Sequence, residues 1–120
     1  MNVHGEPMHE VSLMQDTLIL AARHARQAGG TRIHRLRMRI GPLSGVVPET
    51  LEFAFEIVAK GTIAEGGQLE IERVPIVCYC GPCAAEFTAA DMLCECPTCK
   101  TPSFDVRSGR EMHLMSVEVS

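Results

Sequence analysis

Apolar residues recur every three or four positions over residues 9–28, which is the spacing of one face of a helix. The pattern predicts an amphipathic helix that ends at the flexible Gly29-Gly30 pair. A second helix is predicted over Pro48–Lys60, because proline suits a first helical turn and Gly61 follows the last apolar position. The predicted buried positions are Val11, Met14, Leu18, Ala21, Ala22 and Ala25 in the first helix, and Leu51, Ala54, Phe55 and Val58 in the second.

Three further stretches alternate between apolar and other residues, as half-buried strands do. Residues 32–40 would turn three arginines outward to solvent, and would turn inward His34, Leu36, Met38 and Ile40. The stretches Gln68–Val74 and Met112–Val119 would turn inward Leu69, Ile71, Met115, Val117 and Val119. The chain thus reads helix, strand, helix, strand, a cysteine-rich segment and a last strand. We expect an α/β (α+β) fold with two helices on a small three-stranded sheet.

All six cysteines lie between Cys78 and Cys99. Cys80-Gly-Pro-Cys83 and Cys96-Pro-Thr-Cys99 form two C-x2-C pairs with twelve residues between them, close to the spacing of paired zinc knuckles. One tight turn directs both sulfurs of a pair at the same point, and Zn²⁺ binds four thiolates in a tetrahedron. We therefore predict structural zinc at Cys80, Cys83, Cys96 and Cys99, in a zinc-ribbon-like mini-domain inserted before the last strand. Cys78 and Cys94 are either replacement ligands or free thiols.

Two other interpretations of the cysteines, a redox motif and a disulfide framework, are weaker, and six cysteines in 120 residues are too few for a disulfide scaffold. Cys-Gly-Pro-Cys is also the thioredoxin redox motif, but that motif needs a strand, a long helix and a βαβ sheet around it. Only 37 residues follow Cys83, and they contain the second pair. A zinc-ribbon adaptor that binds protein or nucleic acid without metal transfer stays open as the alternative function. No nucleophile beside a base and no phosphate-binding glycine loop appears, so we expect no enzyme activity.

Charge and composition argue against several partners. Eleven Lys and Arg against fifteen Asp and Glu give a net charge of −4, which disfavours binding to phosphate backbones. Four Phe, one Tyr and no Trp argue against a base-stacking platform. No apolar run reaches the length of a membrane span, and the first ten residues lack the apolar core of a signal peptide. We expect a cytoplasmic protein without nucleic-acid or membrane partners.

Several short motifs follow one another in a characteristic order: Met8-His9-Glu10, Ile40-Gly-Pro-Leu-Ser-Gly-Val46, Pro48–Phe55, the four paired cysteines and Gly109-Arg-Glu-Met112. Together they resemble the HypA/HybF family of nickel metallochaperones in [NiFe]-hydrogenase maturation, over about residues 8–120. The resemblance implies a nickel-binding α/β domain (1–75 with 108–120) and a zinc domain (76–107). It also implies Ni²⁺ delivery to the hydrogenase large-subunit precursor with a maturation GTPase and, in some members, support of urease maturation. A homodimer is one oligomeric state that stays open.

The resemblance places nickel at Met8, His9 and Glu10. Ni²⁺ accepts a square plane of nitrogen donors, which an imidazole, a terminal amine and backbone amides supply. A carboxylate alongside either orients these ligands or adds an oxygen donor. Residues Met1–Pro7 precede the motif, so an amine at Met8 requires that translation starts there. The alternatives are a harmless extension with a different coordination sphere, or a contribution from His4.

Overall fold

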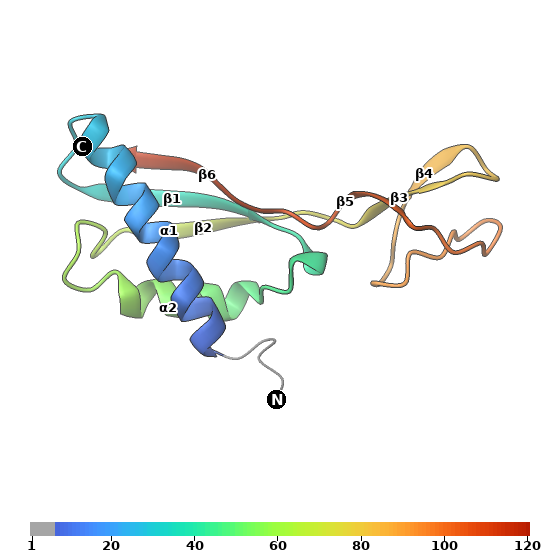
Figure 1. The fold of residues 1–120 in the computed structure, drawn as a ribbon, viewed down its shortest axis with the longest axis horizontal. Coiled ribbons are helices and arrows are strands. Elements are labelled where there is room, and N and C mark those ends of the chain that lie inside the picture. The colour runs from blue at the N-terminus through green and yellow to red at the C-terminus, as the bar shows by residue number, and fades with distance from the viewer. Residues whose placement is uncertain (1–6) are drawn as a thin grey trace.

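The computed structural model describes residues 7–120 and consists of two three-stranded sheets, one of them covered by two helices (Figure 1). The molecule is long and flat, with principal extents of 53 × 35 × 17 Å. His4, one of the alternative nickel ligands, lies outside the described residues. Along the chain the elements are α1 (Pro7–Gln27), β1 (Ile33–Ile40), the short 3-10 helix η1 (Pro42–Ser44), α2 (Pro48–Val58), β2 (Gln68–Arg73), β3 (Val77–Cys80), β4 (Ala85–Thr88), β5 (Asp105–Ser108) and β6 (Met112–Val119).

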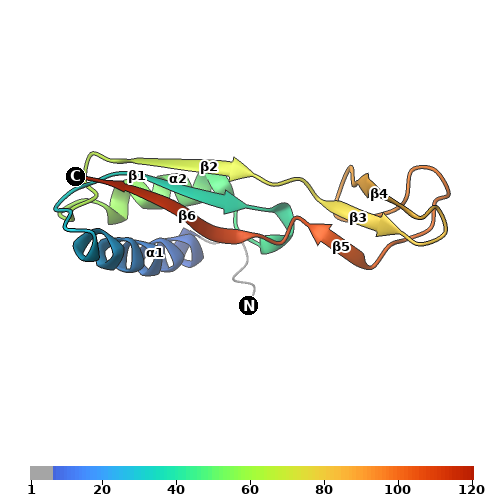
Figure 2. The same ribbon diagram turned by 90° about the horizontal axis from the view of Figure 1, so that it is seen from above.

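The first sheet has β1 at its centre, parallel to β2 and antiparallel to β6. Both helices lie on the same side of this sheet (Figure 2). Their apolar faces meet the inward residues of β1 in one core, in which Met14, Leu36 and Leu51 are fully buried. The expected α+β fold, with two helices on a small sheet, is therefore confirmed. No helix among the described residues is both long and apolar enough to span a membrane.

Two strand positions were predicted on the wrong face, because the pairing of β1 with β6 contains irregularities. One register shift lies between Ile33 and Arg35, and it leaves His34 exposed, with its Nε2 2.6 Å from the Ser120 hydroxyl. A second shift lies opposite Met115, which is 44% exposed, while Leu114 packs on the core instead. A slip of one residue moves a side chain to the opposite face of a sheet.

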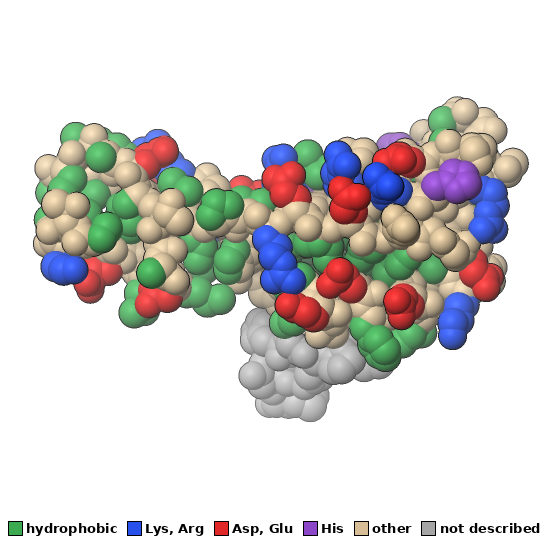
Figure 3. Space-filling model, turned by 180° about the vertical axis from the view of Figure 1, so that it is seen from behind, with side chains coloured by type: hydrophobic (Ala, Val, Ile, Leu, Met, Phe, Trp, Pro, Cys, Tyr) green, Lys and Arg blue, Asp and Glu red, His purple; other side chains and the backbone are tan. Residues whose placement is uncertain are grey.

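The uncovered face of the first sheet carries rows of opposite charge (Figure 3). Arg37 and Arg39 of β1 each lie 3.0 Å from a carboxylate of β2, Glu70 and Glu72 respectively. Arg35 lies between Glu70 and Glu118 at about the same range, 3.5 and 3.4 Å. The three arginines are thus paired across strands as well as exposed to solvent, which neutralises this face.

The second sheet, in the order β4-β3-β5, lies beyond the ends of β2 and β6 (Figure 1). We call residues 76–108, which contain it, the distal lobe. Its core is small: Ile76, Cys78 and Cys94 are buried, with a few half-buried neighbours. Where the lobe meets the first sheet, the Leu43 N–H donates to the Gly109 carbonyl at 2.7 Å. Gly41 faces the same carbonyl so closely that a Cβ there would overlap it.

Candidate metal centres

The structure brings the four predicted zinc ligands together in the distal lobe. Cys80 ends β3, Cys83 lies in the turn to β4, and the other two lie between β4 and β5. The four Sγ atoms lie within 4.8 Å of one another, with Cys80–Cys99 at 3.5 Å and Cys83–Cys96 at 3.9 Å. A tetrahedron with Zn–S bonds of about 2.3 Å has S–S edges of about 3.8 Å, so the four sulfurs fit a zinc ion.

In both cysteine pairs, the residue that follows the second cysteine has a left-handed backbone conformation. The residue after each second cysteine, Ala84 or Lys100, has a positive φ, 51° and 63° respectively. Non-glycine residues rarely adopt this left-handed conformation, which costs energy. The Ala84 N–H returns to the Gly81 carbonyl at 3.1 Å, and the Lys100 N–H returns to the Cys96 carbonyl at 2.9 Å. The two turns thus share a strained residue directly after the second cysteine, although their returning hydrogen bonds span three and four residues respectively.

The four thiols are electrostatically unequal. The hydroxyl and backbone N–H of Thr101 lower the pKa of Cys99 to about 6, and the hydroxyl lies 3.2 Å from its Sγ. The neighbouring thiols of Cys99 and Cys80 raise the pKa of Cys83 to about 12. The Cys83 sulfur is therefore the one that most favours its proton. A bound dication must displace the remaining protons, so metal binding releases protons.

A second set of candidate ligands begins α1. His9 is exposed in the first helical turn, whereas Glu10 is 0% exposed. One Glu10 carboxylate oxygen accepts the Val47 N–H at 3.1 Å, and the other is buried without a hydrogen-bond partner among the described residues. Glu10 therefore ties the start of α1 to the chain just before α2. Met8 lies within α1, and the structure does not describe its side chain.

Comparison with known proteins identifies the family of the chain. Residues 8–119 match the family model described as "Hydrogenase/urease nickel incorporation, metallochaperone, hypA". The chain belongs to the HypA family. It is 51% identical to the hydrogenase maturation factor HypA of Picosynechococcus, with 93% of this chain and 99% of that protein aligned. It is 40% identical to the HypA of Geobacter sulfurreducens over the same shares of the two chains.

Two solved HypA structures share the fold. The solution structure of the Ni metallochaperone HypA from Helicobacter pylori superposes with a TM-score of 0.63 at 23% identity, covering 92% of this chain and 96% of that one. A second structure, titled "Solution structure of HypA protein", gives a TM-score of 0.68 at 25% identity, covering 94% and 97%. These matches confirm the predicted resemblance and fold.

Cys78 and Cys94 of this HypA-family chain lie apart from the four-sulfur cluster. Both are buried in the small core of the distal lobe, against Ile76. Burial, followed by the adjacent Cys94 thiol, raises the pKa of Cys78 to about 11. Such a thiol is protonated at neutral pH and behaves as a small apolar side chain. In this structure the two residues are packing positions, and the sequence had left open whether they were free thiols or replacement ligands.

The remaining histidines of this HypA-family chain do not join a cluster. His24, His34 and His113 are all exposed, and each lies on a different element of the first lobe, the name we give to residues 7–75 with 109–120. Within residues 7–120, the four paired cysteines are the one group of three or more potential ligands gathered closely enough to hold an ion.

Proposed function

We propose that the chain carries Ni²⁺ at the start of α1 for hydrogenase maturation and holds structural zinc at Cys80, Cys83, Cys96 and Cys99. The observation that carries this proposal is the contrast between the two donor sets. The distal lobe gathers four sulfurs at tetrahedral spacing, whereas the start of α1 offers an exposed imidazole at His9 in a chain of the nickel-incorporation family. A closed thiolate site suits an ion that stays, and an open nitrogen site suits one that is passed on.

The nickel site uses the His9 imidazole and the backbone amides beside it. Amides in the first turn of a helix have no acceptor within that helix, so they are free to be recruited as nitrogen donors. The Glu10 carboxylate is already buried and bonded to Val47. This contact favours its orienting role, because it fixes the backbone that presents His9. If translation starts at Met8, the terminal amine of Met8 supplies a further nitrogen donor.

The zinc site stabilises the distal lobe, whose apolar core is too small to order it alone. A structural zinc ion contributes on the order of 10 kcal/mol of apparent folding free energy. The two lobes then have separate roles: the first lobe presents nickel, and the distal lobe forms a rigid extension. We propose that the receiving proteins are a maturation GTPase and the hydrogenase large-subunit precursor, with urease maturation proteins as further partners.

Equilibrium dialysis against Ni²⁺ tests the carrier half of the proposal. We expect His9→Ala to lower nickel affinity by at least about tenfold, because one strong nitrogen donor is worth more than about 1.4 kcal/mol. The matched control is His24→Ala, which removes an exposed imidazole from the last turn of the same helix. Equal nickel binding by wild type and His9→Ala would remove the site. A wild-type chain that binds zinc and no nickel would instead support the zinc-ribbon adaptor.

A further inference from the structure

The outer side of α1 carries a stripe of exposed residues that is not used by either metal site. Its members are spaced alternately four and three positions apart: Ser12, Asp16, Ile19, Arg23 and Arg26. A 4-3 spacing keeps side chains on one line along a helix, and it is the spacing by which two helices pack side by side. We call these five residues the α1 seam. Ile19 is its one large apolar member and is 59% exposed.

The charges of the seam are arranged around Ile19. Asp16 lies three residues before it and Arg23 lies four residues after it, about 10 Å apart along the axis. None of the seam's charged residues has an ion-pair partner within residues 7–120. The arginines of β1, by contrast, are all paired with carboxylates on neighbouring strands. The seam therefore offers one negative and one positive site, both free, on either side of an exposed apolar side chain.

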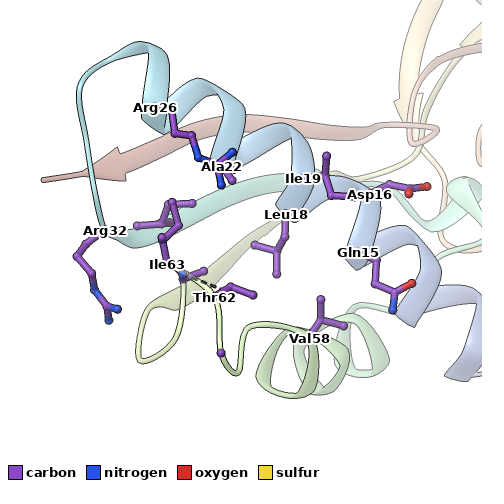
Figure 4. A pocket seen from close by; sticks show the side chains of 13 residues that line it. Gln15, Asp16, Leu18, Ile19, Ala22, Arg26, Arg32, Val58, Thr62 and Ile63 are labelled. Carbon is purple, nitrogen blue, oxygen red and sulfur yellow. Dashed lines mark hydrogen bonds between the residues drawn. The ribbon is translucent and has the colours of Figure 1, made fainter.

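A cavity of about 900 Å³ adjoins the seam, between α1 and the segment that follows α2. Its walls are mainly apolar, and Leu18, Val58 and Ile63 point into it (Figure 4). Asp16 and Ile19 line its rim from α1. An apolar side chain from a second helix laid along the seam would have this hollow beside it.

We propose that the α1 seam is the contact surface for a second copy of this chain, with the two α1 helices antiparallel. A twofold axis beside Ile19 brings the two Ile19 side chains together. The same axis places Asp16 of each copy opposite Arg23 of the other, and Ser12 opposite Arg26. The contact between Asp16 and Arg23 thus occurs twice, as an isologous interface requires. A parallel arrangement would instead place like charges together, which is unfavourable.

Charge reversal tests this pairing without touching either metal site. We expect the wild-type chain to sediment as a dimer at ~100 µM, and Asp16→Arg or Arg23→Asp alone to weaken dimerisation at least about tenfold, since each creates two like-charge contacts. An equimolar mixture of the two variants should dimerise again. In the mixed dimer one copy carries arginine at both positions and the other carries aspartate at both, so each of the two contacts joins opposite charges. Circular dichroism checks that α1 stays folded in each variant.

The mixed sample separates antiparallel pairing from a non-specific effect of charge on association. The matched control is Glu52→Arg, which makes the same charge change at an exposed position of α2 and should leave the dimer intact. A monomeric wild type at this concentration overturns the proposal. The seam would then be a surface for the helix of a different protein. A dimer that survives both reversals, or a mixture that associates no better than its components, overturns the antiparallel pairing. These outcomes do not depend on nickel binding.

Discussion

Two cysteine substitutions in the distal lobe separate metal ligation from packing. Cys83 is exposed, so replacing its side chain by serine removes almost no buried surface. Cys78 is 0% exposed and belongs to the small core of the lobe, yet it lies outside the four-sulfur cluster. If zinc orders the lobe, the exposed residue is the more important of the two. If apolar packing orders the lobe, the buried residue, Cys78, is the more important.

The structure sets the size of each effect. Cys78→Ala deletes one buried sulfur and should cost about 1 kcal/mol of unfolding free energy, a usual value for such a change. Cys83→Ser removes one of four zinc ligands and with it much of a contribution on the order of 10 kcal/mol. The first sheet has its own separate core, so both variants should keep it folded.

Amide NMR spectra report on the two lobes separately, and inductively coupled plasma spectrometry gives the zinc content. We expect Cys83→Ser to lose zinc and the dispersed signals of β3–β5, while the signals of β1, β2 and β6 persist. Cys78→Ala should retain one zinc per chain and a complete spectrum. A Cys83→Ser protein with an ordered, zinc-free distal lobe, or a Cys78→Ala protein in which the lobe alone unfolds, would refute the structural role of zinc.

Three further predictions follow from single contacts. Glu10→Ala should cost about 2–4 kcal/mol in urea denaturation, because it opens a cavity and leaves a backbone N–H unpaired, and Glu10→Gln should cost less; equal costs would contradict the anchoring role. Zinc should be released as the pH falls, because protons compete with the ion for the four thiolates. A zinc content, measured after dialysis at successively lower pH, that stayed constant into acid would exclude the thiolate site. Gly41→Ala should lower the thermal midpoint by several degrees, because its Cβ would overlap Gly109, while Gly81→Ala meets open space and should leave the midpoint unchanged.

The sequence predicted the elements of the first lobe well because their apolar periods are long. Both helices and all three strands of the first sheet appear within a few residues of the expected bounds. The errors at His34 and Met115 have one cause: a strict alternation cannot anticipate a pairing irregularity, which depends on the neighbouring strand. The three short strands of the distal lobe were not predicted. Each has four residues, too few for a periodic signal in the sequence, and the alternation of half-buried and buried side chains over Val77–Cys80 becomes visible only in the structure.

The candidate sites show the same limit. Spacing alone identified the four cysteines that the structure gathers, because C-x2-C pairs carry their geometry locally. The burial and hydrogen bonding of Glu10 could not be predicted from spacing, because its partner Val47 lies 37 residues further along the chain. A carboxylate in a motif looks like a ligand, and only the tertiary contact shows that it is buried and already bonded.

That contact also explains why the turn after β1 matters to both lobes of the molecule. Leu43 packs on the core of the distal lobe and donates its N–H to the Gly109 carbonyl, while Val46 is buried in the core of the first lobe. The next residue, Val47, donates its N–H to Glu10 beside His9. Five consecutive residues therefore contact the distal lobe, the first core and the start of α1. A displacement of the backbone at Gly41 therefore shifts residues that contact both regions. We expect the Gly41→Ala variant to change the amide chemical shifts of both Ile76 and His9. Gly81→Ala should change neither.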